Sequence, residues 1–142
     1  MARRVVITGQ GAICALGDTA TAVTQAMLNG ENGISDLKFA NVDRLNVKIG
    51  GQIHGYDASA RFSRSELALY DPFTQFALIA GREAVAQSGV VFNDQQALKS
   101  GVILGTAGAG LQTQDESFRQ VYEEGKNRVH PFVVPRLMGN AA

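Results

Sequence analysis

Near its N-terminus the chain reads Val5-Val6-Ile7-Thr8-Gly9-Gln10-Gly11-Ala12. The first four residues are all β-branched, and such a short uninterrupted run is typical of a strand buried on both faces of a parallel sheet. The glycines predict a turn, after which Asp18 or Thr19 can cap a helix that Asn29-Gly30 ends. The inward positions of that helix are expected to be Val23, Ala26 and Met27. This order of elements favours an α/β domain.

A strand followed by Gly9-x-Gly11 also raises the possibility of a dinucleotide-binding turn. That motif wants glycine or alanine where Cys14 stands, and an acidic residue closing a second strand about 20 residues further on. The sequence meets neither requirement. We therefore interpret the two glycines as a tight turn between a strand and a helix.

A second helix is predicted in the middle of the chain. Asp71-Pro72 is a strong helix start, because Asp caps the helix and Pro lacks an N–H that would have no partner there. Ser88-Gly89 predicts its end. Small residues recur at helical spacing along it, at Ala77, Ala80, Gly81 and Ala84. Such a stripe lets a helix approach a neighbouring backbone closely, which suits a central position.

Three further elements are predicted. Gly101-Val102-Ile103-Leu104-Gly105 reads as a second buried strand. A helical pattern covers 111–122, and a short exposed strand with a bulge is expected around Val47, Ile49 and Ile53. The glycine-rich segment 105–110 is not a phosphate-binding loop, because that motif needs G-K-[ST] and no lysine occurs between Lys99 and Lys126.

Composition excludes several classes of protein. The chain has 142 residues, 45% of them hydrophobic, with 13 Lys+Arg against 13 Asp+Glu. The length fits one modest domain, and the zero net charge gives no electrostatic reason to bind nucleic acid or an anionic membrane. No apolar run approaches the ~20 residues of a membrane helix, and the apolar run at the N-terminus is too short for a signal peptide. We expect a cytoplasmic α/β protein.

The residues that could carry chemistry are few. The single cysteine, Cys14, excludes a disulfide framework, and its apolar neighbours predict a small buried hydrophobe. We expect His54 to be a surface or structural residue, and His130, which precedes a proline, to be a structural polar residue. Neither histidine has an acidic residue at metal-ligand spacing, so no metal site is predicted.

Several segments together resemble the β-ketoacyl-acyl carrier protein synthases. The stretch from Arg3 to Gly11 resembles that family's opening, R-R-V-V-[IV]-T-G-x-G. The stretch from Asp71 to Ala80 matches D-x-F-x-x-x-A-x-x-A, and Glu83-Ala84 with Ser88-Gly89 matches E-A-x-x-D-S-G. The stretch 128–135 resembles R-x-S-P-F-F-V-P, with histidine and valine at the serine and second aromatic positions.

The resemblance implies a thiolase-like layered α/β fold. Residues 1–142 would form the N-terminal portion of a ketoacyl synthase domain, within its first α/β/α half, and the mixed sheet would be incomplete in this chain. The start at Met1-Ala2-Arg3 leads us to expect a stand-alone enzyme rather than a module of a larger synthase. We expect the chain to be truncated before the nucleophile segment.

The family is an acyltransferase family that joins an acyl group to a malonyl unit on acyl carrier protein by decarboxylative Claisen condensation. Its cysteine nucleophile and two histidines lie beyond the matched segments. The resemblance therefore implies no catalytic residue within residues 1–142, no cofactor, and no activity for this chain alone.

Four residues are implied to line the acyl pocket. Gly108 and Ala109 follow the second predicted strand, and family members that take medium and long chains often carry a bulkier aliphatic residue at the position of Gly108. Phe132 and Val133 occupy a segment that lies at the family's dimer interface. The alternative, that the glycines only satisfy a crowded turn, stays open. The implied partners are acyl carrier protein, malonyl-acyl carrier protein and a second copy of the chain.

A second function is compatible with the same residues. The parent protein could be a non-catalytic homologue, resembling the chain-length factor that pairs with a ketosynthase in polyketide assembly. The residue at the nucleophile position separates the two hypotheses, because the enzyme has cysteine there and the non-catalytic subunit commonly has glutamine.

Overall fold

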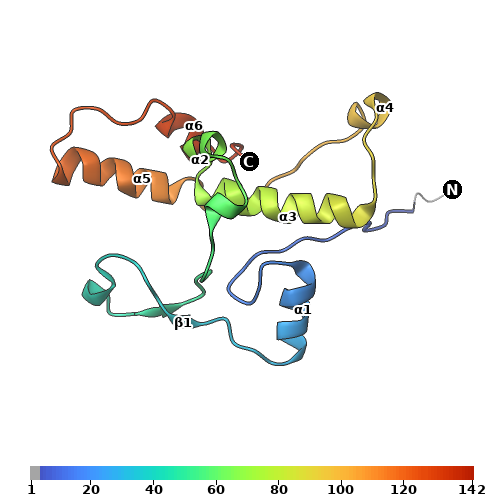
Figure 1. Ribbon diagram of the computed structural model, residues 1–142, viewed down its shortest axis with the longest axis horizontal. Coiled ribbons are helices and arrows are strands. Elements are labelled where there is room, and N and C mark those ends of the chain that lie inside the picture. The colour runs from blue at the N-terminus through green and yellow to red at the C-terminus, as the bar shows by residue number, and fades with distance from the viewer. Residues whose placement is uncertain (1–3) are drawn as a thin grey trace. The chain divides into compact units, whose positions relative to one another are not determined.

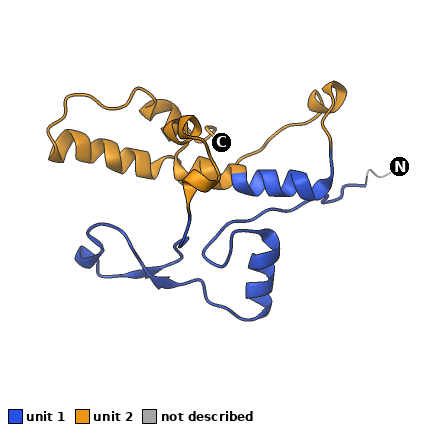
Figure 2. Cartoon of the chain, in the orientation of Figure 1, with its two compact units in different colours: residues 1–56, 79–90 blue, residues 57–78, 91–142 orange. Residues whose placement is uncertain are grey.

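The computed structural model describes residues 4–142, and their contacts divide the chain into two compact units. Unit 1 comprises residues 1–56 and 79–90, and unit 2 comprises residues 57–78 and 91–142 (Figure 2). The six α-helices of the described residues (Figure 1) are α1 Ala20–Leu28, α2 Arg64–Leu69, α3 Pro72–Ser88, α4 Asp94–Ala97, α5 Leu111–Phe118 and α6 Val133–Leu137. Short 3-10 turns span Val42–Arg44 and Ala58–Ala60, and a π-helical turn, Arg119–Glu123, extends α5.

The predicted helix boundaries are confirmed. The Thr19 side chain accepts a hydrogen bond from the Ala22 N–H and caps α1, which ends at Asn29 before Gly30 with φ +70°. Helix α3 begins at Pro72 directly after Asp71, and Gly89 follows its last residue with φ +66°. Each boundary is set by a local signal, which is why a sequence pattern could place it.

The two buried strands predicted at 5–8 and 101–105 are wrong for this chain. Neither segment is a strand, and Val5 and Ile103 are 93% and 101% exposed. A strand exists only where a neighbouring strand completes its hydrogen-bond ladder, and the described residues offer neither segment such a partner. The observed sheet is a short antiparallel pair of β1 (Ser35–Asp36) and β2 (Ile49–Gly50), in which Ser35 is opposite Gly50. Strand β2 confirms the short exposed strand expected near Ile49.

Helix α3 organises unit 1 through its small residues. A Cβ atom at Gly9 would collide with the carbonyl oxygen of Ala84, and one at Gly11 with that of Ala80. The Gly9-x-Gly11 pair is therefore required for close approach of a backbone segment to a helix, as the small-residue stripe predicted.

Side chains of α3 also bind the backbone of this segment. A carboxylate oxygen of Glu83 accepts a hydrogen bond from the Ala12 N–H at 2.9 Å, and both its oxygens accept from Ala20, the first residue of α1. Gln87 accepts from the Gln10 N–H in the same way. These bonds give acceptors to the backbone N–H groups of Gln10 and Ala12 in the turn that was predicted after residues 5–8.

Two residues that were expected to be buried, Cys14 and Met27, are exposed. Cys14 is exposed, because it lies in a tight turn closed by reciprocal backbone hydrogen bonds with Gly17, at 2.8 and 3.2 Å. Met27 is also exposed, whereas Ala26 beside it is buried. The inward face of α1 is therefore narrower than its apolar pattern predicts. No helix in the described part of the chain has the length and apolar character needed to span a bilayer.

Candidate functional site

The loop before α5 contains the first pair of predicted acyl-pocket residues. Gly108 is exposed and Ala109 is half-buried, and both precede the buried Gly110, which is the N-cap of α5 with φ +60°. A Cβ atom at Gly110 would lie 2.5 Å from the Arg136 carbonyl oxygen and 2.7 Å from the Leu137 Cα. Gly110 is therefore required by both its conformation and its contact with α6. At Gly108 an added Cβ would meet only the Leu111 side chain, at 3.1 Å.

The start of α5 is held from outside the helix by Asp71. The Asp71 side chain is buried, and its Oδ2 accepts hydrogen bonds from the Thr113 N–H at 2.9 Å and the Thr113 hydroxyl at 2.6 Å. Its Oδ1 accepts from the Phe73 N–H in the first turn of α3, at 3.2 Å. Gly110, the N-cap residue of α5, has no side chain that could accept a hydrogen bond from the first turn of the helix. The carboxylate of Asp71, which lies 42 residues before Thr113 in the sequence, accepts the hydrogen bond from the Thr113 N–H instead.

The second predicted pair lies at the start of α6. Phe132 is the N-cap residue of α6 and is exposed, and Val133 is its first residue and is half-buried. The Phe132 N–H donates to His130 Nδ1 at 3.2 Å, and the two rings lie 5.6 Å apart. This local bond gives His130 the structural role that was expected of it.

The segments that carry the two predicted pairs both adjoin α6. Helix α5 packs on α6, and Gly110 contacts Arg136 and Leu137 near the C-terminal end of α6. Phe132 and Val133 stand at the opposite end of α6. Gly110, the residue after the first pair, therefore lies beside the last residues of α6, and the second pair is at the start of α6.

A cavity of about 550 Å³ adjoins the same loop in unit 2. It is lined by Val102, Leu104, Gly105, Thr106, Gly139, Asn140 and Ala142. The lining residues come from the end of the predicted second strand and from the C-terminal segment. These two segments lie close together, because a Cβ atom at Gly139 would be 3.5 Å from the Thr106 side chain. No acidic, basic or thiol side chain lines it, so it can accommodate a group but offers no reactive side chain.

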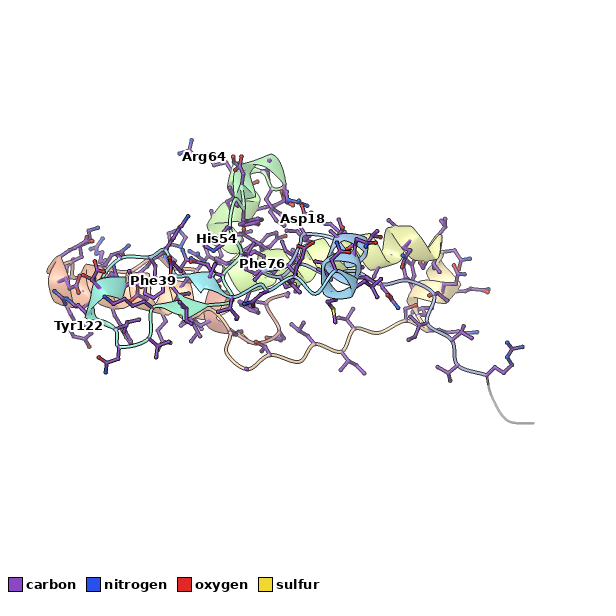
Figure 3. The ribbon with its side chains drawn as sticks, turned by 90° about the horizontal axis from the view of Figure 1, so that it is seen from below. Asp18, Phe39, His54, Arg64, Phe76 and Tyr122 are labelled. Carbon is purple, nitrogen blue, oxygen red and sulfur yellow. The ribbon has the colours of Figure 1, made fainter. Side chains whose placement is uncertain are left out.

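Titratable groups are scattered over the described residues. His54 lies on the surface, as expected, and its Nε2 forms a 2.8 Å hydrogen bond with the Ser35 hydroxyl. Arg64 projects from the start of α2 (Figure 3). Hydrogen bonds from the hydroxyl and N–H of Ser59 lower the pKa of the exposed Asp57 carboxyl. No group of three His, Cys, Asp or Glu side chains that could hold a metal ion occurs within residues 4–142.

Sequence reasoning missed the role of Asp71 at the start of α5 in unit 2, and the role of Glu83 within unit 1. It assigned Asp71 only to the start of α3, and gave Glu83 no role beyond a motif match. The local signal at Asp71 was visible, but its bond to Thr113 joins segments far apart in sequence. No local pattern could have identified that second partner.

Comparison with known proteins gives a consistent answer. The sequence profile described as "Beta-ketoacyl synthase, N-terminal domain" matches residues 2–142. The chain is 32% identical over 140 residues to "3-oxoacyl-[acyl-carrier-protein] synthase 2" of Staphylococcus aureus strain N315, covering 99% of this chain and 34% of that protein. A protein of the same name from Synechocystis sp. is 31% identical over 140 residues, with the same coverage.

A solved structure supports the fold. The crystal structure of a β-ketoacyl synthase from Burkholderia phymatum STM815 matches with a TM-score of 0.72 and 22% sequence identity, covering 96% of this chain and 34% of that one. This likeness confirms the predicted thiolase-like fold class. This chain spans about a third of the length of the relatives that it matches. Because the match to the profile of that family's N-terminal domain extends over nearly every residue, the chain belongs to the β-ketoacyl synthase family.

Proposed function

We propose that residues 1–142 are the N-terminal portion of a 3-oxoacyl-acyl carrier protein synthase. This enzyme would elongate acyl chains in the cytoplasm by decarboxylative Claisen condensation with malonyl-acyl carrier protein. The observation that carries the proposal is the family match over residues 2–142. The relatives named 3-oxoacyl-[acyl-carrier-protein] synthase 2 align over 99% of this chain.

The chemistry places demands that this chain meets only in part. A cysteine thiolate must take the acyl group as a thioester, which a helix N-terminus favours. Two histidines then assist loss of CO2 and stabilise the enolate, while backbone N–H groups hold the thioester oxygen. We assign these reacting groups to segments beyond residues 1–142. The chain by itself is then inactive and contributes the acyl pocket and an interface.

Gly108 and Ala109 would line the acyl pocket from the loop before α5. Gly108 is exposed, and an added side chain there meets only Leu111. The absence of a side chain at this position leaves this part of the pocket open, without the gate that a bulkier residue would form. The proposal needs no cofactor.

Phe132 and Val133 would reach the pocket of a partner subunit in a homodimer. Large apolar side chains are exposed along α5, the π-helical turn and α6, at Phe118, Tyr122, Phe132 and Val134 (Figure 3 labels Tyr122). Exposed apolar side chains of this size favour burial against another protein surface. Acyl carrier protein is the expected transient partner.

Gly108→Ile tests the pocket assignment. In the protein expressed from its whole reading frame, the branched side chain should fill the part of the pocket that glycine leaves open, so the ratio of the rates with long and short acyl chains should change. Gly108→Ala should give a smaller change in the same direction, because its Cβ meets only a flexible side chain. An unchanged chain-length profile in Gly108→Ile would contradict the assignment.

The proposed function is tested by the residue at the nucleophile position. The reading frame downstream of Ala142 should encode a cysteine soon after, and the whole protein should form 3-oxoacyl product from acyl and malonyl carrier-protein thioesters. Glutamine at that position, with no condensation, would identify the chain-length-factor type of subunit instead. A reading frame that ends at Ala142 would contradict the proposal outright.

A further inference from the structure

The Asp71 carboxylate stands at the starts of two helices. Asp71 and Thr113 are each only 2% exposed, so their hydrogen bonds are shielded from water. Three donors converge on the carboxylate: the Phe73 N–H from α3, and the N–H and hydroxyl of Thr113 from α5. The positive ends of both helices also point at this one negative charge. All of these residues belong to unit 2.

The chain is fixed at two residues, Gly110 and Thr113, that follow the exposed residues 106–108 of the loop before α5. Gly110 is wedged against Arg136 and Leu137 of α6, and Thr113 is bonded to Asp71. Residues 106–108, in contrast, are exposed, and their one local bond runs from the Gly108 N–H to the Thr106 hydroxyl at 3.3 Å. The position of Gly108 and Ala109 therefore depends on how firmly the first turn of α5 is fixed.

We propose that Asp71 is a positioning residue for the acyl pocket, which through its buried bonds to Thr113 fixes the first turn of α5 and hence the placement of Gly108 and Ala109. This inference rests on the proposed function, because it takes Gly108 and Ala109 as pocket residues. It assigns acyl-chain selectivity partly to a side chain that does not touch the substrate. Asp71 takes no part in the reaction itself.

Two substitutions, Asp71→Asn and Thr113→Val, test whether this role is distinct from a contribution to the stability of the whole fold, and Thr113→Ser is the conservative variant. Asp71→Asn keeps the shape but turns one acceptor oxygen into an amino group, which then faces N–H and O–H donors. Thr113→Val removes only the hydroxyl bond and leaves the backbone bond, so it is the milder change. Thr113→Ser keeps both bonds and should behave like the original protein.

Matched controls carry the same substitutions elsewhere. Asp57→Asn alters an exposed carboxylate at the start of a 3-10 turn. Thr24→Val removes an exposed hydroxyl that bonds the Ala20 carbonyl oxygen within α1. Neither control should affect residues 106–113 or the acyl pocket.

The experiment measures hydrogen–deuterium exchange and the rates of condensation with short, medium and long acyl thioesters. Both use the protein expressed from its whole reading frame. Loss of a hydrogen bond between Asp71 and Thr113 should raise the rate of amide exchange over residues 106–113 about tenfold. The exchange rates of other segments should rise less. We also expect the ratio of long-chain to short-chain rates to change by about tenfold in Asp71→Asn and less in Thr113→Val.

The inference is overturned if rates fall equally for every chain length, or if exchange over 106–113 stays unchanged in both variants. Local exchange that rises without any change in chain-length ratio also overturns it, because the loop then moves without consequence for the pocket. If the unaltered protein condenses no acyl chain, the proposed function fails, and the link from Asp71 to the acyl pocket is overturned with it. The exchange measurement then decides only whether Asp71 fixes α5.

Discussion

At the scale of single residues, Gly11 shows how the absence of a side chain determines packing in unit 1. Gly11→Ala would drive a Cβ into the carbonyl oxygen of Ala80, which belongs to a helix and cannot yield easily. We expect a loss of about 3 kcal/mol in the free energy of unfolding, measured by urea denaturation of the protein expressed from its whole reading frame. Gly81→Ala is the matched control, because nothing lies within 4 Å of its added Cβ. A loss in Gly11→Ala no larger than in Gly81→Ala would contradict the close packing.

Asp57 offers a prediction about pH. Its carboxyl pKa lies below the ordinary value of 3.8 because the Ser59 hydroxyl, and next the Ser59 N–H, bond to it. The folded-state pKa is the lower one, so its contribution to stability is present above the unfolded-state pKa and is lost as pH falls through the folded-state value. Ser59→Ala should raise the Asp57 pKa toward 3.8, as followed by NMR titration of the carboxyl carbon. Ser100→Ala should leave it unaltered, and an unmoved pKa in Ser59→Ala would exclude the hydroxyl as the main cause.

Single residues also show where sequence reasoning stops. Asp71 was identified as a helix cap because that signal is local, but its second partner, Thr113, is set by the tertiary fold. Cys14 was predicted buried from its apolar neighbours, yet the turn that it forms with Gly17 leaves it exposed. Composition around a residue does not fix the path of the backbone that carries it.

At the scale of elements, the helices and the short exposed strand near Ile49 were predictable, and the two buried strands were not. Helices α1 and α3 carry their own start and end signals, at Thr19 and Gly30 and at Asp71-Pro72 and Gly89. The segments 5–8 and 101–105 carry strand-type residues, but a ladder depends on a partner strand elsewhere in the chain. The sequence therefore predicts their apolar character and not their pairing.

Glu83 connects elements within unit 1, and its loss should loosen both of its contacts. Glu83→Ala leaves the Ala12 and Ala20 N–H groups without their carboxylate acceptor. Each bond to a charged group contributes about 1.5–3 kcal/mol, so we expect the free energy of unfolding to fall by about 2–3 kcal/mol in the same urea measurement.

The matched control for Glu83 is Glu123→Ala, at an exposed position in the π-helical turn. Removal of an exposed carboxylate of this kind should change the free energy of unfolding by less than about 0.5 kcal/mol. Equal effects of the two substitutions would show that Glu83 does not join α3 to α1.

At the scale of the whole molecule, the distribution of apolar side chains is the informative feature. Within residues 4–142 the buried apolar side chains are Ala26, Phe62 and Ile79. The runs Val5–Ile7 and Val102–Leu104, in contrast, are largely exposed. A set of strand-type apolar segments without partners favours association with other strands.

The 142-residue chain expressed alone should therefore aggregate. Sedimentation velocity should show large or heterogeneous species, and thermal unfolding should lack one cooperative transition. Val5→Lys with Ile103→Lys should reduce this association, because charges on a strand edge oppose pairing. A monodisperse monomer that unfolds cooperatively would contradict the prediction.

The central claim is that this chain supplies the pocket side of a condensing enzyme whose reacting groups lie in other segments. The most direct test compares 3-oxoacyl product and CO2 formed from acyl and malonyl carrier-protein thioesters by two samples: residues 1–142 alone, and the protein expressed from its whole reading frame. We predict product and CO2 from the second sample and neither from the first. Condensation by residues 1–142 alone, or no condensation by the whole protein, would contradict the account.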